Sequence, residues 1–184
     1  MGITVHWEGS TESEEAVKRV IQYAEFFAAS LGWEVKRFTE EGYAGMETAE
    51  EVYEFPDFYT KEQARDFNIK SEDMEESVKE GVIINPTKPF YTETIEISFF
   101  KFKGKYWMKD FCKTQVFGRE EMANLVAHQL LVSLLETIKE TWMPNLKISD
   151  EGGFYKTYNF ETLAERHRSN LILINQCIRY LTGK

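Results

Sequence analysis

The sequence has no long apolar run, only two cysteines, and none of the short motifs that mark common enzyme families. No apolar stretch approaches the roughly 20 residues that a membrane-spanning helix requires. Residues 1–7 hold no basic region followed by an apolar segment, so we expect no secretory signal. These absences predict a cytoplasmic protein that has no membrane partner.

The two cysteines and the missing motifs further limit the kinds of site that the sequence predicts. Cys112 falls in a predicted strand and Cys177 in a predicted helix, and neither has a zinc-type spacing. Two buried free thiols in a reducing compartment are therefore expected rather than a disulfide. The chain has no Gly-x-Ser-x-Gly, Gly-x-x-x-x-Gly-Lys or Gly-x-Gly-x-x-Gly pattern. We predict no cofactor, and the sequence leaves open whether the protein is an enzyme.

The net charge of −9 is unevenly distributed. Residues 1–80 hold 20 acids and 8 bases, whereas residues 81–184 hold 11 acids and 14 bases. An acidic first half repels phosphate, which argues against nucleic acid as a partner. The favoured interpretation is that the acids form a solvated surface that keeps the protein in solution. The alternative is an acidic face that binds a basic partner.

Residues 92–117 predict a β-hairpin that carries much of the sheet. Ile95, Ile97 and Phe99 alternate with polar residues, as a half-buried strand requires. Phe100 then shifts the pattern by one residue, which predicts a β-bulge near Phe99 and Phe100. Gly104 supplies the turn.

Other segments predict the elements around this hairpin. Strands are expected at residues 3–7, 33–38 and 82–84. Apolar spacing predicts helices over residues 119–142 and from Asn159 to about residue 181, and a first helix that ends at Gly32. Ser10 or Thr11 is the expected N-cap of the first helix, with Glu14 completing a capping box.

Residues 40–80 interrupt this regular order. Glycine, proline and many acids break any long period there, and we predict an irregular acidic and aromatic excursion within one domain of residues 1–184. Short helices are expected near residues 61–67 and 71–80.

The predicted order is β-α-β-β-β-β-α-α. It indicates an α+β fold: a curved antiparallel sheet of four to five strands with long amphipathic helices packed on one face. This order is similar to the β-α-β4-α arrangement of TATA-binding-protein-like and helix-grip domains. That resemblance is one of topology, and it implies no function by itself.

Two histidines are the candidate metal ligands. His128 and His167 lie near the apolar faces of consecutive helices, and Glu121, Glu161 or Glu165 would have to supply a third ligand. No His-Glu-x-x-His spacing occurs. The sequence therefore favours two buried neutral imidazoles over a metal site.

Carboxylates offer two further candidates. Residues 150–153 place two acids on a glycine turn beside aromatic residues, a composition that would suit a cation or a substrate hydroxyl. A plain turn with solvated acids is the favoured interpretation. Glu96 and Asp110 in the hairpin are candidates for an acid–base pair.

Lysines and rings alternate along the hairpin, which is the composition of surfaces that bind single-stranded nucleic acid. The alternative is that lysines prevent edge-to-edge pairing while the rings fill the core. The whole-chain charge favours that alternative. The residues concerned are Lys101, Lys103, Lys105, Lys109 and Lys113 with Phe100, Phe102, Tyr106, Trp107 and Phe111.

The first functional hypothesis is a non-catalytic soluble protein that binds a protein partner, a second copy of itself or a small apolar ligand. Aromatic anchors surrounded by charge suit such contacts. The alternative is a hydrolase or isomerase with a pocket between sheet and helices, with or without a metal. The predicted binding residues are Tyr43, Tyr53, Phe55, Phe58 and Tyr59.

Overall fold

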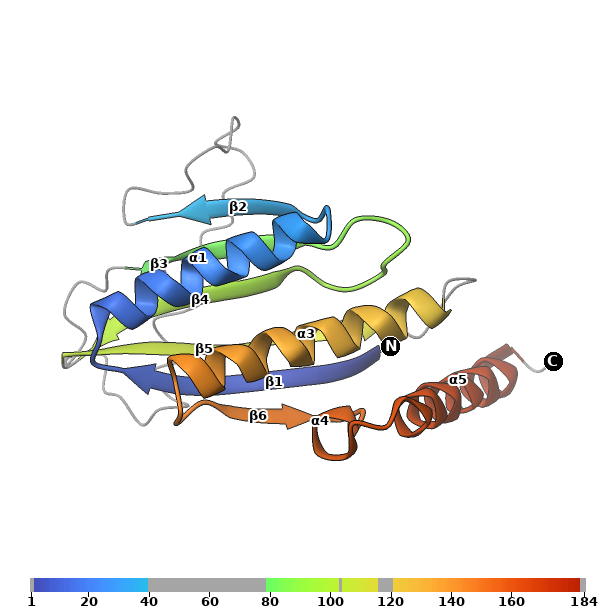
Figure 1. Cartoon of the computed structure of the whole chain (residues 1–184). Helices are drawn as coiled ribbons and strands as arrows, with labels where there is room; N and C mark the ends of the chain where they lie inside the picture. The colour runs from blue at the N-terminus through green and yellow to red at the C-terminus, as the bar shows by residue number, and fades with distance from the viewer. Residues whose placement is uncertain (1, 40–78, 103, 116–120, 183–184) are drawn as a thin grey trace.

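The structure is a computed structural model that describes residues 2–39, 79–102, 104–115 and 121–182. Within these residues, six strands form one antiparallel sheet in the order β2-β3-β4-β5-β1-β6 (Figure 1). The strands are β1 (Gly2–Thr11), β2 (Glu34–Phe38), β3 (Lys79–Asn85), β4 (Ile95–Phe102), β5 (Lys105–Gln115) and β6 (Lys147–Asp150). The helices are α1 (Glu14–Ser30), α3 (Glu121–Thr141), α4 (Phe154–Thr157) and α5 (Phe160–Thr182). The predicted α+β class is confirmed, with six strands in place of four or five.

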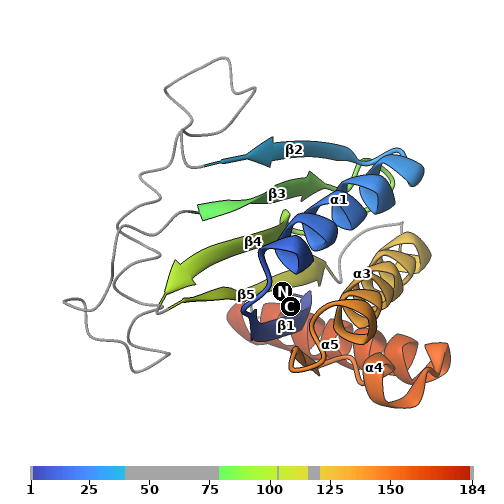
Figure 2. The same ribbon diagram turned by 60° about the vertical axis from the view of Figure 1, so that its left-hand side comes forward.

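Helices α1 and α3 cover the same face of the sheet, and Figure 2 shows them side by side there. Burial of apolar side chains between these two layers is the main favourable contribution to folding. The core is drawn from both layers, and its members include Ile3, Val5, Trp7, Val17, Ile21, Ile97, Phe99, Met108, Leu131, Leu134 and Leu135.

The N-cap of α1 is Ser13, and the prediction of Ser10 or Thr11 is wrong. The Ser13 hydroxyl accepts a hydrogen bond from Ala16 N at 3.1 Å. Ser10 and Thr11 remain extended because β1 pairs with β5 as far as Thr11 and Tyr106. Long-range strand pairing therefore decides where this helix begins.

The two predicted turn glycines are confirmed. Gly32 follows α1 with a φ of 69°, and Gly104 joins β4 to β5 with a φ of 76°. Both lie in the left-handed region that favours glycine over residues with a Cβ.

The predicted bulge near Phe99 and Phe100 concerns the pairing of β4 with its two neighbouring strands. β4 pairs with β3 without interruption through both residues. Toward β5, Phe100 pairs with Trp107 while Thr92 bridges Thr114, so one additional residue lies on the β4 side of that interval. Phe99 belongs to the core, and Phe100 is buried outside it. The ladder with β3 is therefore continuous, whereas the register toward β5 changes by one residue in an interval that includes Phe99.

Several predictions concern residues 40–80, most of which lie outside the described residues. These include the helix at residues 61–67 and the aromatic residues Tyr43, Tyr53, Phe55, Phe58 and Tyr59. The helix expected at residues 71–80 is wrong at Lys79 and Glu80, which begin β3. No helix of the described part has the length and apolar character needed to cross a bilayer.

Candidate functional site

The N-terminal half of α3 places two buried polar side chains over the end of the sheet. Asn124 and His128 lie one turn apart, and each is 1% exposed. Asn124 accepts a hydrogen bond from Tyr91 N at 2.7 Å and donates one to Gln115 O at 3.0 Å. Both of its polar functions therefore contact the main chain at this end of the sheet, as a buried amide requires.

His128 contacts β5 on one side and the end of β6 on the other. Its Nδ1 lies 3.0 Å from the Thr114 hydroxyl, and its Nε2 lies 2.9 Å from Asp150 Oδ1. The Thr114 hydroxyl in turn donates to Ile3 O at 3.1 Å. Both imidazole nitrogens are engaged. We refer to Thr114, His128 and Asp150 as the His128–Asp150 cluster.

Asp150 also organises the turn between β6 and α4. Its Oδ1 accepts a hydrogen bond from Gly152 N at 2.6 Å, and its Oδ2 accepts one from Tyr155 N at 2.8 Å. Burial alone would raise the pKa of Asp150, but the His128 imidazole and these two N–H groups outweigh burial and hold the pKa below its ordinary value.

Gly152 allows these groups to approach closely. A Cβ at this position would lie 2.5 Å from Leu163 Cδ1 and 3.1 Å from His128 Nε2. The space between α3 and α5 at this turn therefore admits only a glycine without rearrangement.

The turn at residues 150–153 differs from the solvated turn that the sequence predicts. The Asp150 side chain is 1% exposed, whereas Glu151 is exposed. Glu151 joins β6 to β1, because its N–H donates to Thr4 O at 3.0 Å and its carboxylate accepts from Thr4 N at 3.0 Å. The two acids therefore have different roles: one is buried against His128 and the other extends the sheet.

The lowered pKa of Asp150 predicts a dependence of stability on pH. The unfolded chain binds this proton at a higher pH than the folded chain, so the contribution of Asp150 is complete above the ordinary carboxyl range. It is lost as the pH falls through the lowered, folded-state pKa. We expect urea unfolding at a series of acid pH values to show that, as the pH is lowered, the free energy of unfolding falls more steeply for the native sequence than for Asp150→Asn. Equal slopes would contradict this.

His167 approaches the same end of β5 from α5. Its Nε2 lies 3.4 Å from Gln115 O, and its side chain is 1% exposed. The two histidines thus contact consecutive residues of β5. Among the residues that the structure describes, no three His, Cys, Asp or Glu side chains form a group that could hold a metal ion. That part of the chain does not provide the three-ligand site considered for His128 and His167.

Glu96 and Asp110 do not form an acid–base pair, because the sheet places them on opposite faces. Glu96 lies between the core residues Ile95 and Ile97 and so points away from the core, where it accepts a hydrogen bond from Ser98 at 2.6 Å. Asp110 pairs with Trp7 and shares the core face of β5. Proton transfer between them is excluded by this placement.

Cys112 is a free, buried cysteine. Burial is the main reason that the pKa of its thiol is raised, and the nearby Glu93 and Asp110 add to the effect. A protonated thiol is a poor nucleophile, which agrees with the predicted structural role. The side chain of Cys177 lies outside the described residues.

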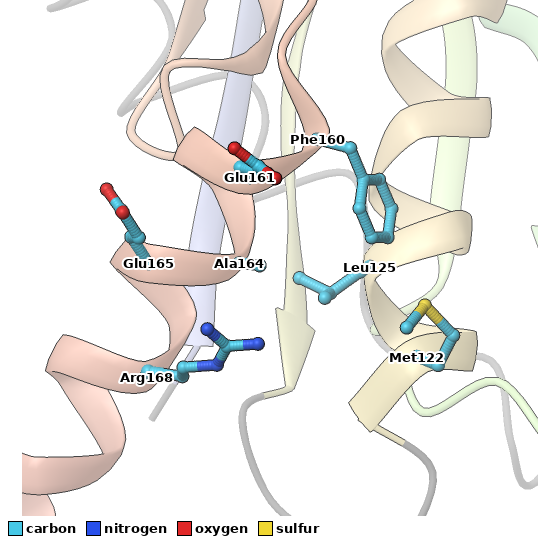
Figure 3. Close-up of a pocket in the computed structure, with 7 residues that line it drawn as sticks. All are labelled: Met122, Leu125, Phe160, Glu161, Ala164, Glu165 and Arg168. Atoms are coloured by element: carbon cyan, nitrogen blue, oxygen red, sulfur yellow. The ribbon is translucent and has the colours of Figure 1, made fainter.

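A groove of about 610 Å³ lies between the first turn of α3 and the N-terminal half of α5 (Figure 3). Leu125 and Ala164 are buried at its floor, at 2% and 6% exposure, whereas Met122 is 63% exposed. Figure 3 shows Met122 and Leu125 on one wall, facing the helix that carries the other lining residues. These are Phe160, Glu161, Ala164, Glu165 and Arg168.

The sequence predicts both groove-forming helices but not the groove. The alternative hypothesis of a hydrolase or isomerase places a pocket between sheet and helices, whereas this groove lies between two helices. Met122 fits the helical spacing of apolar residues in α3, and the charged residues of α5 are typical of any solvated helix face, so neither signals a groove. No protein-family model, curated protein or solved structure matches this chain significantly.

Proposed function

We propose that this protein is a non-catalytic binding protein, and that the groove between α3 and α5 holds the apolar part of a small ligand. The observation that carries the proposal is the combination of volume and lining. About 610 Å³ falls within the range of small-molecule sites. A floor of Leu125 and Ala164 beside the exposed Met122 offers apolar contact at little cost in desolvation.

The rim of the groove supports a ligand that also carries a polar group. Glu161 and Glu165 are exposed on successive turns of α5, and Arg168 follows on the next turn. Few polar groups around an apolar floor are typical of sites that orient a ligand. Exposed charges of this kind add specificity more than affinity.

The His128–Asp150 cluster supports binding over catalysis. A general acid or base must reach the proton that it transfers, yet both nitrogens of His128 already have partners. Asp150 is surrounded by His128 and two N–H donors and is shielded from solvent. Such a cluster serves to fix the turn before α4, and with it the position of α5 beside α3.

Two further predictions from the sequence concern the location of the protein in the cell and a protein partner. A cytoplasmic location is supported by the free thiol of Cys112. A protein partner for the acidic and aromatic residues 40–80 stays a prediction, for which charge reversal of Glu50, Glu51 and Glu54 is the test.

The proposal is tested by titration with N-phenyl-1-naphthylamine, an uncharged apolar dye whose fluorescence rises on burial. We expect saturable binding by the native chain and at least tenfold weaker binding by Met122→Asp, which is about 1.4 kcal/mol. Phe26→Asp is the matched control, because Phe26 is an equally apolar side chain, 70% exposed on α1 and outside the groove.

The control variant should bind the dye as the native chain does. The proposal is wrong if the native chain shows no saturable binding, or if the two variants lose affinity equally.

A further inference from the structure

Helix α5 exposes two large apolar side chains that the fold does not cover. Ile172 is 58% exposed and Leu173 is 56% exposed. The residues of α5 that pack against the rest of the protein, Leu163, Ala164 and His167, are buried and lie on another side of the helix. Figure 1 shows α5 at the border of the molecule. Ile172 and Leu173 therefore belong to an outer face of α5.

Opposite charges flank Ile172 at equal distances along this face. Glu165 precedes Ile172 by seven residues and Arg179 follows it by seven, and both charged side chains are exposed. Seven residues make about two helical turns, a length of about 10 Å, so the three residues lie on one side of α5. Neither charged residue takes part in the salt bridges found within the described residues. We refer to Glu165, Ile172 and Arg179 as the α5 stripe.

The α5 stripe is complementary to itself when a second copy is reversed. In an antiparallel pair of α5 helices that cross at Ile172, each Glu165 lies beside Arg179 of the second copy. Arg168, four residues before Ile172, lies beside the second copy's Gln176, which is uncharged. Twofold symmetry repeats each contact, as it does in most homodimers. The arrangement thus places an ion pair on each side of an apolar centre.

We propose that α5 binds α5 of a second copy of this chain in antiparallel orientation, with Ile172 at the twofold axis and Leu173 beside it. A second copy fits the charges of the α5 stripe better than other partners do. A basic partner would be repelled by Arg179, and an acidic partner by Glu165. Helices that lie on anionic membranes surround their apolar face with lysine and arginine, whereas this stripe carries one charge of each sign.

The dimer contact and the ligand groove use different sides of α5. Figure 3 shows the Glu165 side chain directed away from Leu125 on α3, whereas Arg168 extends toward the space between the two helices. The two sites therefore meet only at the outer edge of the groove, where Glu165 lies. Dimerisation does not depend on the proposed ligand, and the failure of one proposal leaves the other in place.

The test is sedimentation equilibrium of the full chain at a series of protein concentrations up to about 1 mM. Two helices in contact over a few turns bury less surface than a standard interface, so we expect a dimer that dissociates on dilution. Ile172→Asp should weaken dimerisation at least about tenfold, because it places two carboxylates at the twofold axis. Phe26→Asp is the matched control, since Phe26 is 70% exposed on α1, and it should dimerise like the native chain.

Charge reversal tests the orientation of the two helices. Glu165→Arg alone and Arg179→Glu alone should each weaken the dimer several-fold, because each replaces both ion pairs by repulsion. The double variant Glu165→Arg, Arg179→Glu restores the two ion pairs and should regain the native affinity. In a parallel pair each residue would face its own counterpart, so single reversals would change nothing and would contradict the antiparallel arrangement.

Each alternative has its own result. A chain that stays monomeric up to about 1 mM overturns the proposal, as does self-association that Ile172→Asp leaves unchanged. Failure of the double variant to regain affinity overturns it as well. Binding of a monomer to vesicles of phosphatidylcholine and phosphatidylglycerol, lost in Ile172→Asp, would assign the face to a membrane surface instead. Circular dichroism verifies that the variants are folded, and Ile172→Ser replaces Ile172→Asp if that variant is not.

Discussion

Replacing Asp150 by asparagine is expected to lower the free energy of unfolding by about 3 kcal/mol, because it removes a buried carboxylate that accepts several hydrogen bonds and leaves its buried partners incompletely paired. The Asp150 carboxylate contacts His128 Nε2 and accepts hydrogen bonds from two backbone N–H groups of the following turn. The NH₂ group of an asparagine cannot accept, so it would face one of these groups without forming the hydrogen bond. Urea unfolding followed by circular dichroism measures this change.

Two comparisons make the result specific to the cluster. Glu151→Gln alters the adjacent, exposed acid and should cost no more than about 1 kcal/mol. A double-mutant cycle of Asp150→Asn and His128→Gln should show a coupling energy of about 1 kcal/mol or more between positions 128 and 150. If Asp150→Asn costs no more than Glu151→Gln, the cluster does not stabilise the fold as described.

Truncation of Phe99 to alanine is expected to lower the free energy of unfolding by about 3–5 kcal/mol, the usual cost of removing a buried aromatic ring from a core. Phe99 is 0% exposed and packs with the strand and helix residues of the core. The loss includes the transfer energy of the ring and the cavity that it leaves. Urea unfolding at neutral pH measures it.

Phe111→Ala provides the matched control, since it removes the same ring from the opposite face. Phe111 is 50% exposed, and its truncation should change stability by only about 0.5 kcal/mol. A cost for Phe111→Ala that approaches that for Phe99→Ala would mean that the two faces of the hairpin are assigned incorrectly.

The contrast between these phenylalanines shows what the sequence predicts well. Alternation through Ile95, Ile97 and Phe99 identifies the core face of β4, and Gly104 identifies the turn, because both signals are local. The same local reasoning does not show that Phe100, next to Phe99, is buried outside the core.

Elements that depend on distant partners are less predictable. The four residues of β6 are extended because they pair with β1, and no pattern in so short a segment indicates this. Ser10 and Thr11 are good N-cap residues by type, yet pairing with β5 keeps them in a strand. In both cases tertiary contacts override a local preference.

The site shows the same limit. His128 and Asp150 are 22 residues apart in the sequence, and their contact requires α3, β6 and the sheet to be assembled first. The sequence marks both residues as candidates, but for separate reasons and in separate roles. The groove depends on how α5 packs beside α3, and helical periodicity does not specify that arrangement.

The central claim is that the groove between α3 and α5 is a ligand site. Its most direct test is a methyl-resolved NMR titration of the full chain with N-phenyl-1-naphthylamine. We predict chemical-shift changes concentrated at Met122, Leu125 and Ala164, and none at Ile97 in the core between sheet and α1. Saturation with those three methyl groups unmoved, or the largest changes at Ile97, would contradict the claim.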